Sequence, residues 1–265
     1  KIIFDGSDSH GLDQHVLQGM LIQSEKRSKM KIMWLGQAGY RLRSENGLTI
    51  LIDPYLSDSL RKEKGESFKR QIPINGEVLN HVDVLILTHL HGDHTDMETI
   101  DHIIEKNGKI AILAPLNVLD VLRRRYEKNP QDYMLFDRDI EITLKGVRFI
   151  STYAAHSDER PIGVTIEGDG KVICHTGDTM YHKKLLMDLP RGADALLLPI
   201  NGQGYNMNAV DAARLTRMLE PKTVYPMHWD MFKEYGCNVS EFIAAFDEKE
   251  RGIIRIPDHY REYML

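Results

Sequence analysis

Hydrophobic and polar positions along the chain repeat with two different spacings. Short apolar runs that are rich in β-branched residues indicate strands, and apolar residues repeated every three or four positions indicate helices. The strand pattern covers residues 32–35, 40–43, 48–52, 82–87, 110–113, 140–144, 147–153, 163–167, 171–175, 195–199 and 223–226. The helix pattern covers residues 97–105, 118–126, 209–219 and 240–246.

The order of these segments predicts the fold class. Strands dominate the first part of the chain, and strands alternate with helices in the rest, which predicts an α/β (α+β) fold with two sheets between helices. No linker rich in Pro, Gly or Ser divides residues 31–265, so we expect one domain there. Residues 1–30 are expected to form a helical extension. Its amphipathic helix at 11–27 could cover a pocket, contact a second subunit or pack on the core.

Composition narrows the class of protein. The chain has 265 residues, of which 42% are hydrophobic and 28% charged, as in soluble globular proteins. The formal net charge of −5 disfavours a nucleic-acid partner, because such surfaces are more often basic. Cys174 and Cys237 form no Cys-x-x-Cys pair, so we expect no disulfide framework and a cytoplasmic location. No apolar run reaches the length of a membrane span, so we expect no membrane partner.

One short segment suggests chemistry. Directly after the strand at 82–87, His89, His91, Asp93 and His94 form the pattern His-x-His-x-Asp-His. Imidazole nitrogens and carboxylate oxygens are ligands for divalent zinc, manganese and iron. The alternative is a polar loop that happens to contain several histidines, but four such side chains within six residues favour a metal site.

Three later residues occupy equivalent positions. His156, Asp178 and His228 each follow the end of a predicted strand, where loops held by a rigid sheet usually present catalytic groups. Taken singly, each histidine is more often a core or surface residue, and Asp178 could cap a helix at 180–187. Taken together, the seven candidates suggest two divalent ions. We assign the first ion to His89, His91 and His156, the second to Asp93, His94 and His228, and a bridging position to Asp178.

At these residues the chain resembles the metallo-β-lactamase fold superfamily of hydrolases. The five motifs of that superfamily match Asp53, the segment from His89 to His94, His156, Asp178 and His228. The resemblance extends from about Lys31 to Tyr260 and implies a four-layer αββα sandwich of two mixed β-sheets flanked by helices.

Within the superfamily the chain looks closest to the branch that contains ascorbate-6-phosphate lactonase. This closer resemblance rests on five sequence segments: Trp34–Gly39, Leu51–Pro54, His175–Thr179, Leu198–Gly202 and Pro226–Asp230. Lactonases of that branch resemble manganese enzymes, whereas much of the superfamily uses zinc, so either metal is expected. Higher oligomers occur in the branch, which makes a homo-oligomer one expectation. The main zinc class of β-lactamases has a Cys ligand where this chain has Asp178, which argues against antibiotic hydrolysis.

The resemblance also implies roles for two carboxylates. Two divalent ions can share a water molecule, lower its pKa towards neutrality and so provide a hydroxide that attacks an ester, lactone or phosphodiester. Asp93 would bind metal, orient this nucleophile and exchange its proton as general base and acid. Asp53 would not bind metal itself. It would contact the ligands and fix the metal loop, because ligand imidazoles need a set ring orientation.

Substrate contacts are weakly indicated by the sequence. Asn201, Tyr205 and Asn206 lie in a Gly-containing strand-to-helix turn that could approach a ligand, although an ordinary turn capped by Asn206 or Asn208 has the same pattern. Arg160 and Trp229 stand near metal-ligand candidates and are further expectations. The charged stretch 61–70 could be a lid that meets a phosphate or a solvated surface loop.

The sequence therefore predicts a dinuclear metal-dependent hydrolase that acts on a small, anionic ester or lactone resembling a sugar-phosphate lactone. A phosphodiesterase or phospholipase-like hydrolase using the same residues is the first alternative. A metal-binding protein without turnover is the second, and it would leave no open coordination position.

Overall fold

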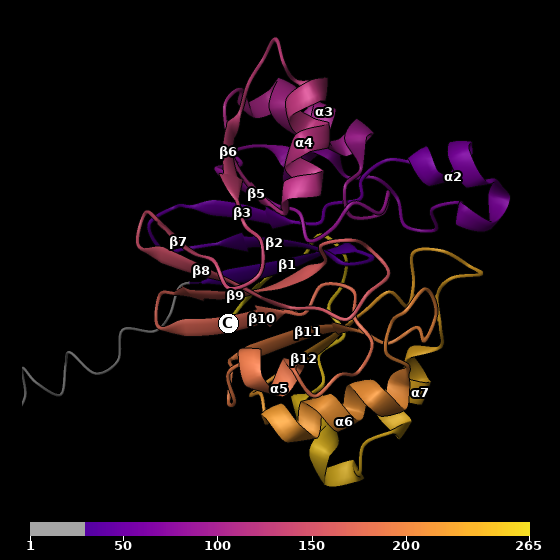
Figure 1. Ribbon diagram of the computed structural model, residues 1–265. Coiled ribbons are helices and arrows are strands. Elements are labelled where there is room, and N and C mark those ends of the chain that lie inside the picture. Colours follow the sequence, from indigo (N-terminus) through magenta and orange to yellow (C-terminus); the bar gives the residue numbers. More distant parts are fainter. Residues whose placement is uncertain (1–29) are drawn as a thin grey trace, which may run out of the picture.

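The computed structural model describes residues 30–265, so the helix expected at 11–27 lies outside the described residues. Two β-sheets pack face to face, and helices cover both outer faces (Figure 1). The layers run helix, sheet, sheet, helix, which confirms the predicted αββα sandwich of two mixed sheets. Within the described residues, no helix is long and apolar enough to cross a membrane.

The first sheet combines parallel and antiparallel pairs. Its strand order is β13 (Glu262–Met264), β1 (Lys31–Gly36), β2 (Gly39–Arg43), β3 (Thr49–Ile52), β4 (Val84–Ile86), β5 (Ala111–Ala114) and β6 (Asp132–Leu135). Strands β3 to β6 pair in parallel, and the other pairs are antiparallel. The sequence pattern missed β6 and β13, which are short, partly exposed edge strands.

The second sheet is built in the same mixed way. Its strand order is β12 (Val224–Met227), β11 (Ala195–Pro199), β10 (Lys171–His175), β9 (Ile162–Gly168), β8 (Val147–Tyr153) and β7 (Glu141–Leu144). Strands β10, β11 and β12 are parallel, and the others are antiparallel. The hairpin of β9 and β10 turns at Gly168, Asp169 and Gly170.

Helices bury one face each against the sheets. Helices α3 (Met97–Asn107) and α4 (Leu116–Arg125) pack on the first sheet, while α5 (Leu185–Asp188), α6 (Ala209–Leu219) and α7 (Val239–Ala244) cover the second (Figure 1). In α3 the buried residues Ile100, Ile103 and Ile104 have helical spacing, and the Asp96 side chain caps its first turn. Full burial of each such side chain stabilises the fold by about 1.5–3 kcal/mol.

Most residues of the charged stretch 61–70 are exposed, as in the solvated segment that we weighed, but the stretch is helical rather than a loop. It lies in α2 (Ser59–Lys64) and the 3-10 segment η1 (Glu66–Phe68), which project from the sandwich (Figure 1). Further 3-10 segments are η2 (Gly76–Leu79) and η3 (Glu248–Ile253). Arg70 is buried and donates to the backbone oxygens of Tyr55, Leu35 and Ile72, so it joins this projection to the first sheet.

The helix weighed at 180–187 is also absent, because the helical turn α5 begins only at Leu185 and its N-cap residue is Lys184. Asp178 is therefore not a helix cap. The turn before α6 is capped by Asn208, one of the two asparagines that we weighed, which accepts from Asp211 N at 2.9 Å.

Strand direction places the functional loops together. Because β2 is antiparallel to both β1 and β3, strands β1, β3 and β4 all run the same way. The same argument through β9 aligns β8 with β10, β11 and β12. The carboxyl ends of all these strands can therefore meet at one edge of the sandwich, where α/β proteins usually bind ligands.

Candidate metal centre

Three imidazole rings meet after β4 and β8. The Nδ1 atom of His91 lies 3.0 Å from Nε2 of His89 and 3.0 Å from Nε2 of His156. The first two residues follow β4 and the third follows β8, 65 residues further along the chain than His91. Three ring nitrogens this close together could hold one ion. These are the residues that the sequence assigns to the first ion.

A second group lies beside the first. The ligand atoms of Asp93, His94 and His228 lie within 4.8 Å of one another. The Nε2 atom of His94 is 3.6 Å from an Asp93 carboxylate oxygen, and the rings of His94 and His228 stack with centroids 5.2 Å apart. His228 follows β12 and has a left-handed φ of +60°, which turns its side chain away from the strand direction. The structure thus brings together the residues assigned to the second ion.

Asp178 lies between the two groups. Its Oδ1 atom is 2.7 Å from Nε2 of His228 and 3.3 Å from Nε2 of His94. Its Oδ2 atom is 3.8 Å from Nε2 of His156 and accepts a hydrogen bond from Asn206 at 3.0 Å. One oxygen of this carboxylate therefore faces each group, which is the arrangement that a bridging ligand requires.

Asp53 supports the ligands from behind. It is fully buried and accepts hydrogen bonds from the Thr88 backbone N–H at 2.8 Å, the Thr88 hydroxyl at 2.6 Å and His94 Nδ1 at 2.8 Å. Because Nδ1 of His94 faces Asp53, Nε2 is the ring nitrogen that faces the site. The Thr88 hydroxyl oxygen lies 3.0 Å from Nδ1 of His89, so the same network also orients that ring.

Two imidazoles of the first group, those of His89 and His156, favour their neutral form. Burial lowers the pKa of His89 well below its ordinary value and also lowers the pKa of His156. Nδ1 of His156 lies 3.2 Å from the backbone oxygen of Tyr205 and donates to it, which leaves Nε2 with a lone pair. Neutral rings with inward lone pairs are the form that binds metal.

The second group has the opposite electrostatic balance. Burial opposes charge on His94, but the carboxylates of Asp178, Asp93 and Asp53 outweigh it and raise the pKa of His94 well above its ordinary value. Burial likewise opposes charge on Asp178, yet His228 and His94 lower its pKa well below the usual range. The carboxylates thus stay ionised and require positive charge between them.

Three buried atoms of this centre test whether a metal ion fits. Nε2 of His94, Nε2 of His228 and Oδ1 of Asp178 have no hydrogen-bond partner, although they face one another at 2.7 and 3.3 Å. Buried polar atoms without partners are rare in folded proteins, and a missing ion is one recognised cause. Two imidazole nitrogens and a carboxylate oxygen form a donor set that suits a divalent ion such as zinc or manganese.

Gln37 is a site residue that the sequence analysis missed. It lies in the turn after β1, is buried and has a left-handed φ of +54°. Its side-chain nitrogen is 2.8 Å from Asp93 Oδ2 and 2.8 Å from His228 Nδ1, so it holds two candidate ligands. Its position in the sequence could have identified it, because Gln37 is a polar residue directly after a strand. His156 and His228 were identified by the same feature.

Gly177 explains how Asp178 reaches the centre. Its φ is +60°, and a Cβ atom there would lie 2.3 Å from the backbone oxygen of Ile162, which cannot move away easily. The chain therefore requires glycine immediately before this ligand.

Gly177→Ala is expected to lower the free energy of unfolding by about 3 kcal/mol, because left-handed strain of about 1–2 kcal/mol adds to the clash with Ile162. Gly170→Ala is the matched control, with a φ of +73° and no atom within 4 Å of the added Cβ. It should cost only about 1 kcal/mol. Urea unfolding measures both, and equal losses would contradict the role of the clash.

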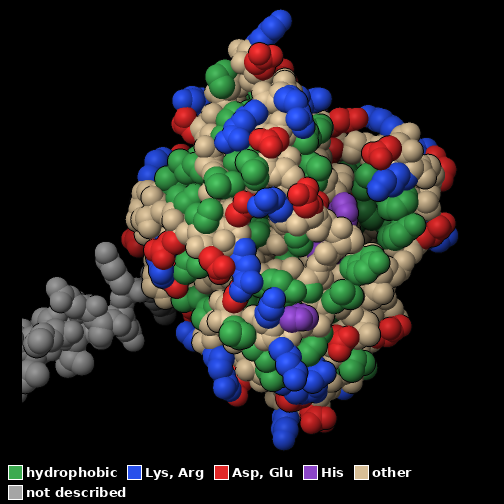
Figure 2. All heavy atoms as spheres, in the orientation of Figure 1, with side chains coloured by type: hydrophobic (Ala, Val, Ile, Leu, Met, Phe, Trp, Pro, Cys, Tyr) green, Lys and Arg blue, Asp and Glu red, His purple; other side chains and the backbone are tan. Residues whose placement is uncertain are grey.

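The cluster forms the floor of a cavity of about 290 Å³. Figure 2 shows histidine at the bottom of a hollow on this face, with hydrophobic side chains along one rim. Of the predicted substrate residues, Asn201, Tyr205 and Asn206 line this cavity. Asn201 donates to the backbone oxygen of Tyr235 at 3.1 Å, which connects the two loops at the rim.

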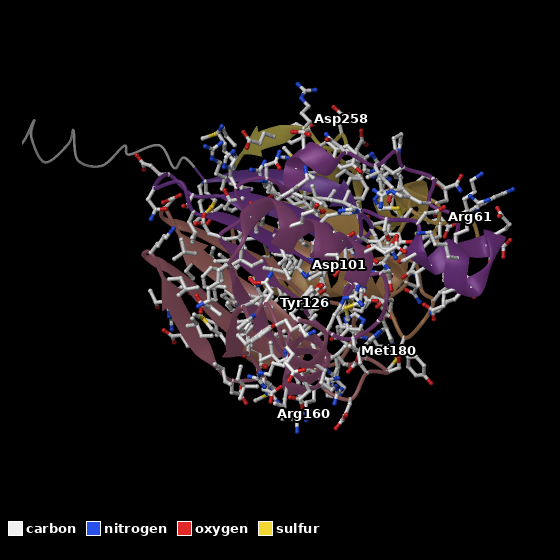
Figure 3. The ribbon with its side chains drawn as sticks, turned by 90° about the horizontal axis from the view of Figure 1, so that it is seen from above. Arg61, Asp101, Tyr126, Arg160, Met180 and Asp258 are labelled. Carbon is white, nitrogen blue, oxygen red and sulfur yellow. The ribbon has the colours of Figure 1, made fainter. Side chains whose placement is uncertain are left out.

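The other two expected substrate residues lie elsewhere. Arg160 is at the periphery of the molecule (Figure 3), where its guanidinium pairs with Asp137 at 2.9 Å. The Trp229 ring stacks on Trp34 with centroids 5.2 Å apart, and neither Trp229 nor Arg160 is among the described residues that line the cavity. Proximity in sequence to His156 and His228 did not place these side chains in the cavity, because Arg160 pairs with Asp137 and Trp229 packs against the hydrophobic core.

A wall of the cavity comes from residues that carried no sequence signal. Lys64 and Phe68 from the α2–η1 projection line it together with Phe232 and Tyr235 from the loop after β12. These two segments are more than 160 residues apart in the chain, so no local pattern could associate them.

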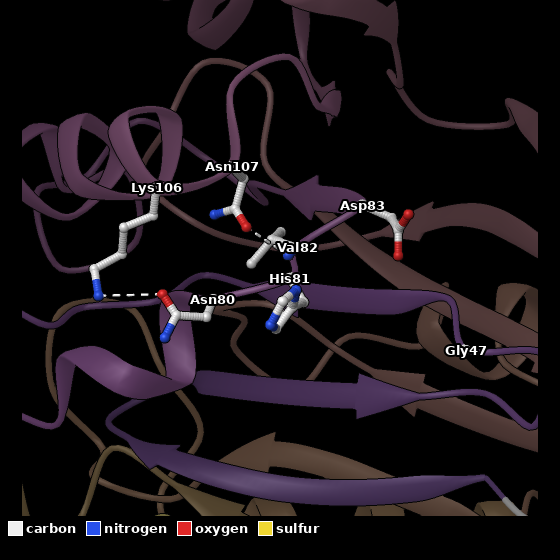
Figure 4. A pocket seen from close by; sticks show the side chains of 7 residues that line it. All are labelled: Gly47, Asn80, His81, Val82, Asp83, Lys106 and Asn107. Atoms are coloured by element: carbon white, nitrogen blue, oxygen red, sulfur yellow. Dashed lines mark hydrogen bonds between the residues drawn. The ribbon is translucent and has the colours of Figure 1, made fainter.

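A second cavity, of about 470 Å³, lies at the opposite, amino end of β4 (Figure 4). Within it, Lys106 donates to Asn80 at 3.2 Å, and Asn107 accepts from the backbone of Val82 at 2.9 Å. The candidate metal ligands all lie at the other end of the strand, so we place the functional site there.

Asp53→Ala is expected to weaken divalent metal binding about 10- to 100-fold without abolishing it, because the ligands remain but the ring of His94 loses its anchor. Asp83→Ala removes a carboxylate at the other end of β4 and is the control. Titration calorimetry of the metal-free variants with zinc measures the effect. Unchanged affinity in Asp53→Ala would contradict the anchoring role.

Fold and site together define a four-layer sandwich of the metallo-β-lactamase type, with a candidate metal centre at the carboxyl ends of its strands. Residues 49–229 match the family model described as beta-lactamase superfamily domain. The chain belongs to this family.

Individual proteins show the same similarity. A UPF0173 metal-dependent hydrolase of Pyrococcus furiosus is 28% identical over 86% of this chain and 97% of its own length. Among solved structures, Igni18, a metallo hydrolase from Ignicoccus hospitalis, superposes with a TM-score of 0.69 at 22% identity, covering 88% of this chain and 97% of that one. An isothiocyanate hydrolase from Delia radicum gut bacteria has a TM-score of 0.70 at 22% identity, covering 89% and 99%. At these identities the two structures show the fold alone.

Proposed function

We propose that this protein is a metal-dependent hydrolase that holds two divalent ions, zinc or manganese, and cleaves a small, anionic ester or lactone, as in the lactonase-like branch. The observation that carries this proposal is Asp178, whose Oδ1 faces His94 and His228 and whose Oδ2 faces His156. The similarity to metal-dependent hydrolases supports the same activity.

The chain's own residues have distinct parts in this activity. When bound, divalent ions would supply Lewis-acid stabilisation of the reacting oxygen and an acidified water. Asp93 lines the cavity, and its side chain is 20% exposed, so it can meet the substrate and accept and return a proton. Gln37 fixes that carboxylate through its hydrogen bond to Oδ2. Asn206 fixes Asp178 in the same way.

Size and charge of the cavity support a small anionic substrate. A volume of about 290 Å³ suits a small molecule rather than a nucleic acid or a lipid with long chains. Lys64 is the one Lys or Arg among the described residues that line it, and no ion pair engages its ammonium group there. Its neighbours Arg61 and Lys62 pair with Glu66 and Glu98 instead.

Lys64→Met is expected to raise KM for a carboxylate-bearing lactone about three- to fivefold with kcat little changed, because an exposed ion pair contributes modestly. Lys62→Met in the same helix is the matched control, since Lys62 is paired with Glu98 and does not line the cavity. Steady-state kinetics at low and high salt measures both. An equal effect on a neutral lactone would contradict the contact with an anion.

Two measurements test the proposed function. Elemental analysis of protein prepared with zinc and manganese should give about two ions per chain, and less than one would contradict the dinuclear site. A substrate panel should show hydrolysis of esters or lactones in preference to bis-p-nitrophenyl phosphate. Turnover of the phosphodiester alone would favour a phosphodiesterase. Turnover of an isothiocyanate alone would instead favour isothiocyanate hydrolysis, the activity named for the similar gut-bacterial enzyme.

A further inference from the structure

The cavity has a feature that ester or lactone hydrolysis alone does not require. Three aromatic rings, those of Phe68, Phe232 and Tyr235, form one of its sides, here called the aromatic wall. The rings of Phe68 and Tyr235 stack with centroids 4.2 Å apart and an interplanar angle of 24°. Phe232 meets Phe68 edge to face at 5.6 Å.

The aromatic wall is anchored rather than loosely placed. Phe232 is 3% exposed and packs edge to face on Tyr55 at 5.6 Å, in a small apolar cluster with Leu60 and Met231. The two segments that carry the rings are joined by backbone pairing, because Gln71 N donates to the oxygen of Met231 at 2.9 Å. A binding surface held in this way loses little conformational entropy when a ligand arrives.

The outer rings of the wall remain partly open to the cavity, and the Lys64 ammonium group lies 5.3 Å from the centroid of the Phe68 ring. Tyr235 is 40% exposed and Phe68 is partly exposed, although both stand beside a strongly charged floor. Exposed aromatic surface that lines a polar site is unfavourable in water unless a ligand covers it. Aromatic rings prefer partners in offset-stacked or edge-to-face geometry, with a gain beyond simple burial of area.

We propose that the aromatic wall binds a planar aromatic group of the substrate, so that the enzyme acts on aryl-substituted esters or lactones. This inference rests on the proposed function and adds the chemical class of the group that flanks the reacting bond. The aryl ring would lie against Tyr235 and Phe68 while the carbonyl group faces the floor between Asp93 and Asp178. An alkyl group of the same acyl compound would reach the floor but leave the wall uncovered.

A matched pair of substrates tests this inference. γ-Phenyl-γ-butyrolactone and γ-methyl-γ-butyrolactone share the reacting ring and differ only in the side group. For the metal-loaded wild-type protein, we expect kcat/KM to favour the phenyl compound at least tenfold. In Phe68→Leu and Tyr235→Leu the preference should fall below about threefold, mainly through a higher KM for the phenyl compound. Tyr235→Phe keeps the ring and should keep the preference.

Each outcome of this comparison decides the inference. A wild-type preference near one, or a preference that survives in both leucine variants, would overturn it even if both lactones are hydrolysed. If neither of these neutral lactones is hydrolysed, equilibrium binding decides the inference, and the panel of esters and lactones described above decides the proposed function separately. Calorimetry should then show 4-phenylbutyrate binding at least tenfold more tightly than pentanoate, with the difference lost in Tyr235→Leu. Equal affinities would reject the aromatic wall as a recognition surface.

Discussion

Asp178→Ala is expected to reduce bound divalent metal from about two ions per chain to one or fewer and to lower kcat/KM by roughly a thousandfold. The carboxylate faces His94 and His228 with one oxygen and His156 with the other, so its loss affects both groups of ligands. Transition-state stabilisation by a metal ion is worth several kcal/mol, and about 4 kcal/mol corresponds to a factor of roughly a thousand.

Elemental analysis and lactone hydrolysis on the same preparation measure this effect. Asp188→Ala is the matched control, because it removes a carboxylate of similar burial that pairs with Arg138 on the surface of the second sheet. Its metal content should equal that of the wild-type protein. If Asp178→Ala retained two ions, the bridging role would be wrong.

Asp93→Ala is expected to lower kcat about 100- to 1000-fold while KM changes little. The reason is that alanine can neither transfer the proton nor bind a metal ion. Its carboxylate reaches the cavity, is held by Gln37 and lies 3.6 Å from His94 Nε2. Asp93→Asn keeps the shape and one ligand oxygen but cannot accept the proton, so it separates the two roles.

The decisive comparison is made at saturating zinc. If excess metal restores kcat in Asp93→Asn to the wild-type value, Asp93 acts only as a ligand and its part in proton transfer is rejected. A loss of kcat that persists when two ions are bound would support proton transfer.

The sequence pattern predicted the candidate metal ligands better than it predicted the residues around them. His89, His91, Asp93 and His94 are adjacent in the chain, and a short segment after a buried strand has few ways to direct its side chains. His156 and His228 could be added because each follows a strand end.

The residues around the ligands were harder to predict. Gln37 lies on a strand-end turn as well, but a single glutamine carries no metal-ligand signal, and its role depends on two side chains 56 and 191 residues away. Arg160 shows the opposite error: it is near His156 in sequence, yet its ion pair with Asp137 holds it at the surface.

The sequence by itself determined the fold class and the identity of the candidate metal ligands, because apolar periodicity and ligand chemistry are local properties of a chain. The beta-lactamase superfamily match confirms the family to which these motifs pointed. Only the tertiary structure decided that Gln37 holds Asp93 and His228 and that Phe68 and Tyr235 share a wall. Those relations join segments whose distance in the chain far exceeds any local period, so they exist only after the two sheets have packed.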